Sequence, residues 1–199
     1  PLLSLFGISK YTNLTETLFL DRCLDLLVPG GRMGVVLPEG VLNNKKLDDV
    51  RHYVEGRAKI MLVVSLPTDV FMAAGANVKP SILFLKKFTE EEAKTYEETQ
   101  AAVEKAVEEQ HRPEMDKLNE DIKNTTDGEK RKKLRSKLRK VKEQMKEESN
   151  RQMKERLDYE VLMGSVDKAG INSVGGECEN ELIDLLAEIN KHKAKHPLW

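Results

Sequence analysis

Three short runs of apolar residues stand out in the first half of the chain, each bounded by proline, glycine or polar residues. They are Met33 to Leu37, Ile60 to Leu66 and Ile82 to Leu85. A strand packed on both faces shows such a continuous run, because neither face alternates with polar residues. The pattern therefore predicts three buried strands of a covered sheet in an α/β fold.

Helical spacing of apolar residues precedes the first two predicted strands. One helix is expected from Thr15, a plausible N-cap, to the Pro-Gly-Gly turn at residues 29–31, and a second from Leu47 to Glu55. Helices alternating with strands predict βαβ units, with the first two strands parallel. The connection from Pro67 to Pro80 has no helical periodicity, so we expect the third strand to run antiparallel to the second.

Two polar segments follow the predicted strand ends, and both are expected to be loops. They are Glu39 to Asn44 after the first strand and Thr68 to Pro80 after the second. In open α/β sheets, ligands bind beyond the carboxyl ends of the strands. These two segments are therefore the first candidates for a functional site.

The composition changes abruptly after Phe88. Residues 89–121 hold twelve Asp or Glu against four Lys or Arg, whereas residues 130–142 hold nine Lys or Arg and no acid. Apolar residues recur at helical spacing on both sides of a turn at Asn124 to Gly128. We expect an antiparallel helical hairpin with a narrow, coiled-coil-like seam, kinked or interrupted at Pro113.

The basic run from Lys130 to Lys142 has two interpretations. It could be a patch that binds nucleic acid. Alternatively, its charges could pair with those of the acidic arm and so determine how the arms associate, although each exposed pair is worth little. The sequence favours the second interpretation, while the surplus of Lys and Arg could still hold DNA or a partner subunit.

Globular character returns near Leu157, where apolar residues and glycine turns precede an amphipathic helix from Asn180 to Ile189. The expected organisation is a first part over residues 1–88, the hairpin as an insertion over residues 89–157, and a C-terminal segment over residues 158–199. The chain begins at Pro1, inside a segment with the pattern of a loop, so we expect a fragment of a longer protein.

Composition narrows the class of protein only modestly. Charged residues make up 34% of the chain, but the net charge is −1. Two distant cysteines do not suggest a disulfide scaffold, and no apolar run reaches the length of a membrane span, so a cytoplasmic protein is expected. His192 and His196 are four residues apart, but no third ligand is in view, and no metal site is expected.

Two stretches carry a family resemblance: ETLFLDRCLDLLVPGGRMGVVLPEGVLNN and VVSLPTDVFMAAGANVKPSILFLKK, within Glu16 to Lys87. They resemble the modification subunit of Type I restriction–modification systems, one of the amino-group adenine DNA methylases. The stretch DYEVLMGSVDKAGINSVGG, residues 158–176, is more loosely similar to the segment that follows the last strand of that family.

The resemblance implies a Rossmann-like methyltransferase sheet, of which this chain would hold the second half: the fifth, sixth and seventh strands. The seventh would be antiparallel and lie between the other two. The resemblance also implies S-adenosylmethionine as methyl donor and the exocyclic amine of adenine as acceptor. DNA and the specificity and restriction subunits of the same system would be the partners.

The same resemblance shows what these 199 residues lack. The family's glycine-rich cofactor loop does not occur here, and neither does its Asn/Asp-Pro-Pro-aromatic motif, because the chain has no Pro-Pro dipeptide. We therefore assign no catalytic and no cofactor-binding residue, and we expect the fragment alone to be inactive.

Phe71 is the residue to which the resemblance gives a role, since an aromatic residue before the last strand stacks on the flipped-out target base. The alternative is a phenylalanine that packs its loop onto the sheet. Lys79 could reach a DNA phosphate. Asn43 and Asn44 could contact DNA or act as turn and capping residues. Glu39 receives no role.

Two classes of function stay open. The first is part of an adenine-specific DNA methyltransferase subunit, with methyltransferases acting on RNA or protein as a lesser variant. The second is a non-enzymatic assembly module that uses the hairpin for subunit association. The first strand would have an unpaired edge where the family's fourth strand belongs. We therefore expect a homodimer, or that edge covered by residues 1–13 or by the C-terminal segment.

Overall fold

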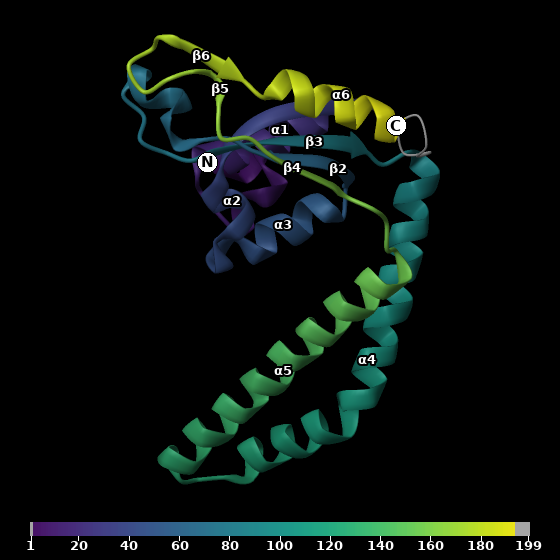
Figure 1. Ribbon diagram of the computed structural model, residues 1–199. Coiled ribbons are helices and arrows are strands. Elements are labelled where there is room, and N and C mark those ends of the chain that lie inside the picture. Colours follow the sequence, from purple (N-terminus) through teal and green to yellow (C-terminus); the bar gives the residue numbers. More distant parts are fainter. Residues whose placement is uncertain (1, 194–199) are drawn as a thin grey trace. The chain divides into compact units, whose positions relative to one another are not determined.

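The computed structural model describes residues 2–193, which divide into two compact units (Figure 1). One unit combines the chain up to Glu90 with the chain from Glu160 onward and is called the α/β unit below. The other, Glu91–Tyr159, is called the hairpin unit. No helix within residues 2–193 combines the length and the apolar character needed to cross a membrane.

The α/β unit is built on a four-stranded sheet with the order β1-β3-β2-β4. The three predicted runs form β1 (Arg32–Pro38), β2 (Ala58–Ser65) and β3 (Pro80–Lys87). β3 lies between β1 and β2 and pairs antiparallel with both. The third strand therefore has the direction that the irregular connection before it predicted.

The three predicted strands are all present, but the prediction is incomplete, because the C-terminal segment adds further strands. β4 (Leu162–Ser165) pairs parallel with β2, while β5 (Ala169–Ile171) and β6 (Glu177–Asn180) form a separate two-stranded ribbon. β4 has only four residues, and Gly164 interrupts its apolar pattern. That glycine, expected at a turn, lies within the strand, where a Cβ would come 3.0 Å from the Leu185 side chain of α6 (Leu182–Lys193). Close packing of helix on strand therefore explains it.

Helices lie where the periodicity placed them, with two corrections. α1 (Thr15–Leu26) and α3 (Asp48–Glu55) precede β1 and β2, but Leu14, not Thr15, occupies the N-cap position of α1. The segments expected as loops contain short helices, because a few residues without a full amphipathic period escape detection. These helices are α2 (Glu39–Asn43), η3 (Lys45–Leu47) and η4 (Thr68–Ala74), and further 3₁₀ turns lie at η1 (Leu3–Leu5) and η2 (Gly7–Lys10).

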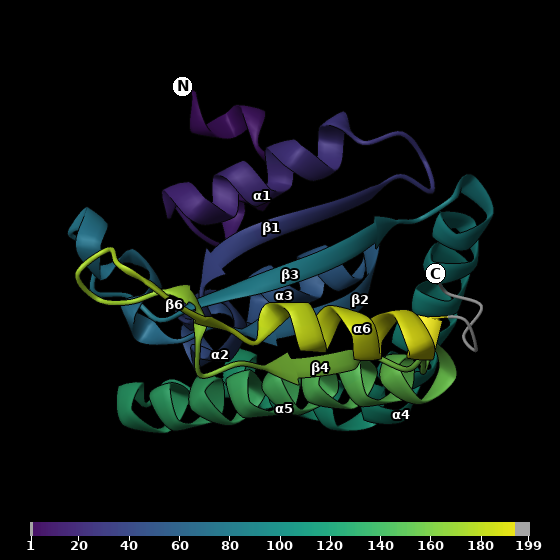
Figure 2. The same ribbon diagram turned by 45° about the horizontal axis from the view of Figure 1, so that its top comes forward.

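The two faces of the sheet are covered by different helices. Side chains alternate between the faces of a strand. On β3, Leu83 and Leu85 join the cluster that includes residues of α1 and α3, whereas Ile82 and Phe84 pack in the cluster that includes α6. Figure 2 shows α6 in front of the sheet and α3 behind it. The C-terminal helix therefore closes a face that the first ninety residues leave open.

A buried carboxylate ties three segments of the α/β unit together. Asp21 of α1 is fully buried, and it accepts hydrogen bonds from the Tyr53 hydroxyl (2.8 Å) and the backbone N–H of Ile8 (3.3 Å). Burial, and then the hydrogen bond to Asp21, raise the pKa of Tyr53 well above its usual range. This polar contact joins α1, α3 and η2 beneath the sheet.

The expectation that the C-terminal segment covers the outer edge of β1 is wrong. Its strand β4 pairs with β2, at the opposite edge of the sheet. Residues 2–13 contain 3₁₀ turns and no strand. Within residues 2–193, the outer edge of β1 therefore has no strand partner, and such an edge is open to pairing with another segment.

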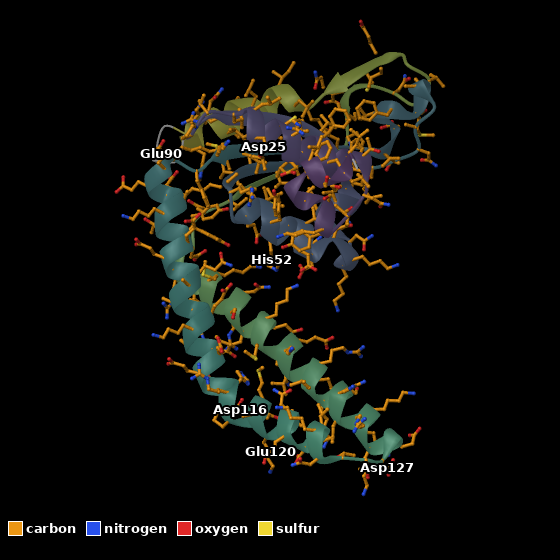
Figure 3. All side chains as sticks on the ribbon, turned by 180° about the vertical axis from the view of Figure 1, so that it is seen from behind. Asp25, His52, Glu90, Asp116, Glu120 and Asp127 are labelled. Atoms are coloured by element: carbon orange, nitrogen blue, oxygen red, sulfur yellow. The ribbon has the colours of Figure 1, made fainter. Side chains whose placement is uncertain are left out.

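The hairpin unit consists of α4 (Glu90–Asn124) and α5 (Gly128–Arg156), joined by a short turn. The Asp127 side chain caps α5 by accepting from the N–H groups of Glu129 and Lys130. α4 continues through Pro113 without interruption and changes direction near Asp116 (Figure 3), as a proline within a helix explains. The buried apolar residues of the hairpin unit are Val103, Val107 and Leu118 on α4 and Val141 on α5.

Candidate functional site

The ends of β1 and β2 meet at the start of β3. The N–H of Glu39, just after β1, donates to the carbonyl of Lys79 (2.9 Å). The N–H of Leu66, just after β2, donates to the carbonyl of Pro80 (3.1 Å). Residues 79 and 80 therefore hold both strand ends together, and the polar segments that follow them emerge at the same edge of the sheet.

Two of the predicted DNA-contact residues come together at this edge through Glu39. The Lys79 Nζ lies 3.3 Å from Glu39 Oε2, and the Asn43 amide donates to Glu39 Oε1 at 3.4 Å along α2. Lys79 is about half exposed. A phosphate would therefore compete with the Glu39 carboxylate for Lys79. Sequence reasoning gave Glu39 no role, because its partner lies forty residues away in the chain.

Asn44 does not join this cluster. Its side-chain oxygen accepts the N–H of Lys46 (2.9 Å) and caps η3. Its backbone carbonyl accepts from the Arg51 guanidinium (2.8 Å), which also reaches the carbonyl of Val41. Asn44 thus has the capping role that the sequence held open for it, and Arg51 anchors this corner of the unit.

Phe71 lies in η4, in the connection between the end of β2 and the start of β3. Its side chain is 39% exposed, and its neighbour Met72 is exposed to a similar degree. Gly75 has a left-handed φ of 82° and ends η4, with its N–H donating to the carbonyl of Met72 (2.9 Å). The helix therefore displays an aromatic and a thioether side chain at the sheet edge.

The β5–β6 ribbon reaches the same place. A Cβ on Gly175, at the tip of the ribbon, would lie 3.3 Å from the Cβ of Ala73 in η4. Next to it, Val174 is 85% exposed. The Asn172 side chain shapes the tip by accepting the N–H groups of Val174 and Gly176. Asn172 and the pair Gly175-Gly176 lie between the two short strands, and both residue types favour turns. The sequence therefore held a clue to this ribbon.

Asp69, also in η4, holds an acceptor that the rest of the described chain leaves unused. Its Oδ1 is buried and has no hydrogen-bond partner within residues 2–193. A buried acceptor without a donor costs free energy, and such atoms are rare in proteins. Asp69 Oδ1 is such an atom. No sequence signal marks it, because burial of one oxygen depends on the tertiary fold.

The described residues do not fit S-adenosylmethionine. The segment after β1 enters α2 directly, and Gly40 has no left-handed conformation of the kind that a glycine-rich cofactor turn uses. Nor do residues 2–193 bring three His, Cys, Asp or Glu side chains together as metal ligands. His192 lies in α6, and His196 lies outside the described residues.

Comparison with known proteins identifies the family to which the chain belongs. A family model described as N-6 DNA Methylase matches residues 7–160. The chain is 34% identical over 95 residues to the Type I restriction enzyme EcoKI methylase subunit of Escherichia coli (strain K12), and to the StySJI methylase subunit of Salmonella typhimurium (strain LT2). Each alignment covers 42% of this chain and 18% of the relative.

Among solved structures, the chain is similar to the Type I restriction enzyme EcoKI M protein, with 30% identity and a TM-score of 0.36. The match covers 40% of this chain and 16% of that one. The chain thus spans less than a fifth of the length of these curated relatives. Because the family model covers most of its residues, the chain belongs to the N-6 DNA methylase family.

Proposed function

We propose that this chain is part of an adenine-specific DNA methyltransferase subunit of a Type I restriction–modification system. The parent protein transfers a methyl group from S-adenosylmethionine to the exocyclic amine of adenine. The observation that carries the proposal is the match of the N-6 DNA methylase model to residues 7–160. In this proposal, the partners are DNA and the specificity and restriction subunits of the same system.

The sheet supports this assignment. We take β1, β2 and β3 as the second half of a Rossmann-like methyltransferase sheet, with β3 antiparallel between the other two. The open outer edge of β1 is where the first half of such a sheet would pair. The methyl donor and the Asn/Asp-Pro-Pro-aromatic motif belong to that first half, so residues 1–199 alone should give no methyl transfer.

Phe71 is proposed to stack on the flipped-out target adenine. A base must leave the duplex to be reached, and an aromatic face recovers part of the stacking that is lost. The ring is exposed at the carboxyl edge of the sheet, where ligands of open α/β sheets bind. Nearby, the half-exposed Lys79, which pairs with Glu39, would meet a phosphate of the displaced nucleotide.

Substitution of Phe71 by alanine in the complete methyltransferase, assembled with its specificity subunit, tests this role. Stacking on an aromatic side chain is worth about 1–3 kcal/mol, so kcat/KM for DNA should fall roughly 5- to 150-fold. Phe19→Ala is the matched control. Phe19 is also an exposed phenylalanine (66%), but it lies on α1 and not in the segments that follow β1 and β2. That control should keep its activity.

A second readout separates stacking from folding. With 2-aminopurine in place of the target adenine, the parent enzyme should hold the flipped base quenched against the ring, and Phe71→Ala should brighten it. Phe71→Trp should restore both quenching and activity. The stacking proposal would be overturned if Phe71→Ala methylated normally, or if it lost activity only in step with a fall in melting temperature.

A further inference from the structure

The basic run of the hairpin unit is exposed on α5 and is not neutralised by the acidic arm. Six of its residues form what we call the basic surface: Lys132, Lys133, Arg135, Lys137, Lys140 and Lys142. All six are exposed, and none forms an ion pair with any residue in the described part of the chain. The cross-arm pairing that the sequence favoured therefore does not occur at these positions.

By contrast, two other basic residues of the run contact neighbouring residues of the hairpin unit. Arg131 donates to the carbonyl of Thr125 (2.6 Å) and holds the turn between the helices. Arg139 pairs with Glu143 of its own helix (3.6 Å). The residues of the basic surface have no such task, so their charges are not needed to hold the hairpin together.

The spacing of the basic residues matches a regular array of negative charge. Positions three or four residues apart share a helix face. Residues 133, 137 and 140 form one such row, with roughly one cation per 5.4 Å turn, and residues 132 and 135 form a second, shorter one. Lys142 lies two turns beyond Arg135. Duplex DNA carries about one charge per 1.7 Å of its axis, which such rows can follow along a strand.

The residue types on this surface indicate which class of ligand it can bind. Protein interfaces need an apolar or aromatic centre and are depleted in lysine, whereas residues 130–142 contain no aromatic residue and no fully exposed apolar side chain. Single-stranded nucleic acids are held by stacking on aromatic rings, which this surface also lacks. What it can bind well is the phosphate backbone of a duplex.

We propose that the basic surface of α5 is a sequence-independent binding site for the backbone of duplex DNA, separate from the base-stacking loop at η4. It rests on the proposed function only in taking DNA as the polyanion. Such a site would raise the local concentration of DNA and release counterions on binding, without reading any base.

The test uses the complete 199-residue chain and a fluorescent duplex of arbitrary sequence, followed by anisotropy over a range of salt concentrations. The variant is Lys132→Gln/Lys133→Gln/Lys137→Gln/Lys140→Gln. Its matched control, Lys94→Gln/Lys105→Gln/Lys117→Gln/Lys123→Gln, removes the same charge from exposed positions of α4. The first variant should lose at least about tenfold in affinity, and its slope of log K on log salt should become shallower by about 3 to 4. The control should change neither quantity comparably.

Three outcomes would overturn the proposal. Equal weakening by both quadruple variants would show a general charge effect, and absence of duplex binding would show a merely solvated face. Salt-sensitive self-association that only the α5 variant abolishes, measured by sedimentation, would show that the surface meets the acidic arm of a second copy. Phe71→Ala should leave duplex binding unchanged, so failure of the base-stacking role can be told apart from failure of this site.

Discussion

The α/β unit and the hairpin unit differ in how many of their side chains are buried in a core. In the α/β unit, two buried apolar clusters fill both faces of the sheet. In the hairpin unit, the buried residues of helices 35 and 29 residues long are Val103, Val107, Leu118 and Val141. A narrow seam orients two helices but leaves most of their surface to solvent. Most side chains of the hairpin unit are therefore exposed to solvent and take no part in its core.

The charged side chains of the two units differ in whether they have a partner. At the sheet edge, Glu39 contacts both Lys79 and Asn43, so these polar side chains have defined neighbours. On the basic surface of α5, six cations have no ion-pair partner within residues 2–193. Defined neighbours suit the placement of a single base, whereas free cations suit attraction to a repeating backbone. If both proposals hold, the chain places the contact to a single base and the attraction to the DNA backbone on two different units.

The largest effect should come from truncating one buried side chain in each unit. Leu85 on the central strand and Val107 on α4 are almost equally buried. Leu85→Ala should cost about 2–5 kcal/mol of unfolding free energy, because it leaves a cavity in a packed core. Val107→Ala should cost about 1–2 kcal/mol, from the lost methyl groups and a seam that can close up.

Hydrogen exchange resolved by segment checks where each loss occurs. Leu85→Ala should lower protection throughout β1, β2 and β3 and leave α5 unchanged, and Val107→Ala should do the converse. If either variant lowered protection in both units to the same degree, the two units would unfold together and the contrast between them would fail.

A smaller effect should follow from Tyr53→Phe, which tests the polar contact beneath the sheet. The change leaves the buried Asp21 without one of its donors, at a cost of about 1–3 kcal/mol in urea unfolding. Tyr11→Phe is a control, because Tyr11 packs edge-on against Tyr53 but makes no bond to Asp21. An unchanged Tyr53→Phe protein would show that water replaces the hydroxyl.

The same residue predicts a loss of stability in alkali. Burial and Asp21 raise the pKa of Tyr53 in the folded protein, so the neutral phenol is favoured there. Its contribution is complete below the unfolded pKa of about 10 and declines as pH rises above it. Unfolding followed between neutral and strongly alkaline pH should show this decline in the parent and a weaker one in Tyr53→Phe. Identical profiles would contradict it.

The smallest effect should be the stability of the Glu39–Lys79 pair. A double-mutant cycle of Glu39→Gln and Lys79→Gln should give a coupling of about 0–1 kcal/mol that fades with salt, because both side chains are partly exposed. A coupling of several kcal/mol would mean that the pair holds the sheet edge together instead of being available to a ligand.

Much of the fold could be read from apolar pattern, and the misses have a common cause. Long apolar runs identified β1, β2 and β3, and heptad-like spacing identified α4 and α5. By contrast, β4 is short and contains Gly164, and α2 and η4 hold too few residues to show a period. Elements of that length owe their structure to what packs against them rather than to their own residues.

The candidate site divides in the same way. Its place beyond the strand ends and the role proposed for Phe71 came from strand boundaries and family resemblance. The contact of the ribbon tip with η4, the pairing of Glu39 with Lys79 and the unused oxygen of Asp69 did not. Each of these depends on residues brought together from separate segments, and residue type alone carries no such information.

By itself, the sequence determined the three strands β1, β2 and β3, the two long helices, the segregation of acid from base, and the family. These follow from local periodicity, from composition and from short stretches of matching residues. Only the tertiary structure decided that the C-terminal segment adds β4 and α6 to the sheet, and that the basic surface goes unpaired. Pairing between distant segments, and its absence, is a matter of three-dimensional proximity, which depends on how the whole chain packs.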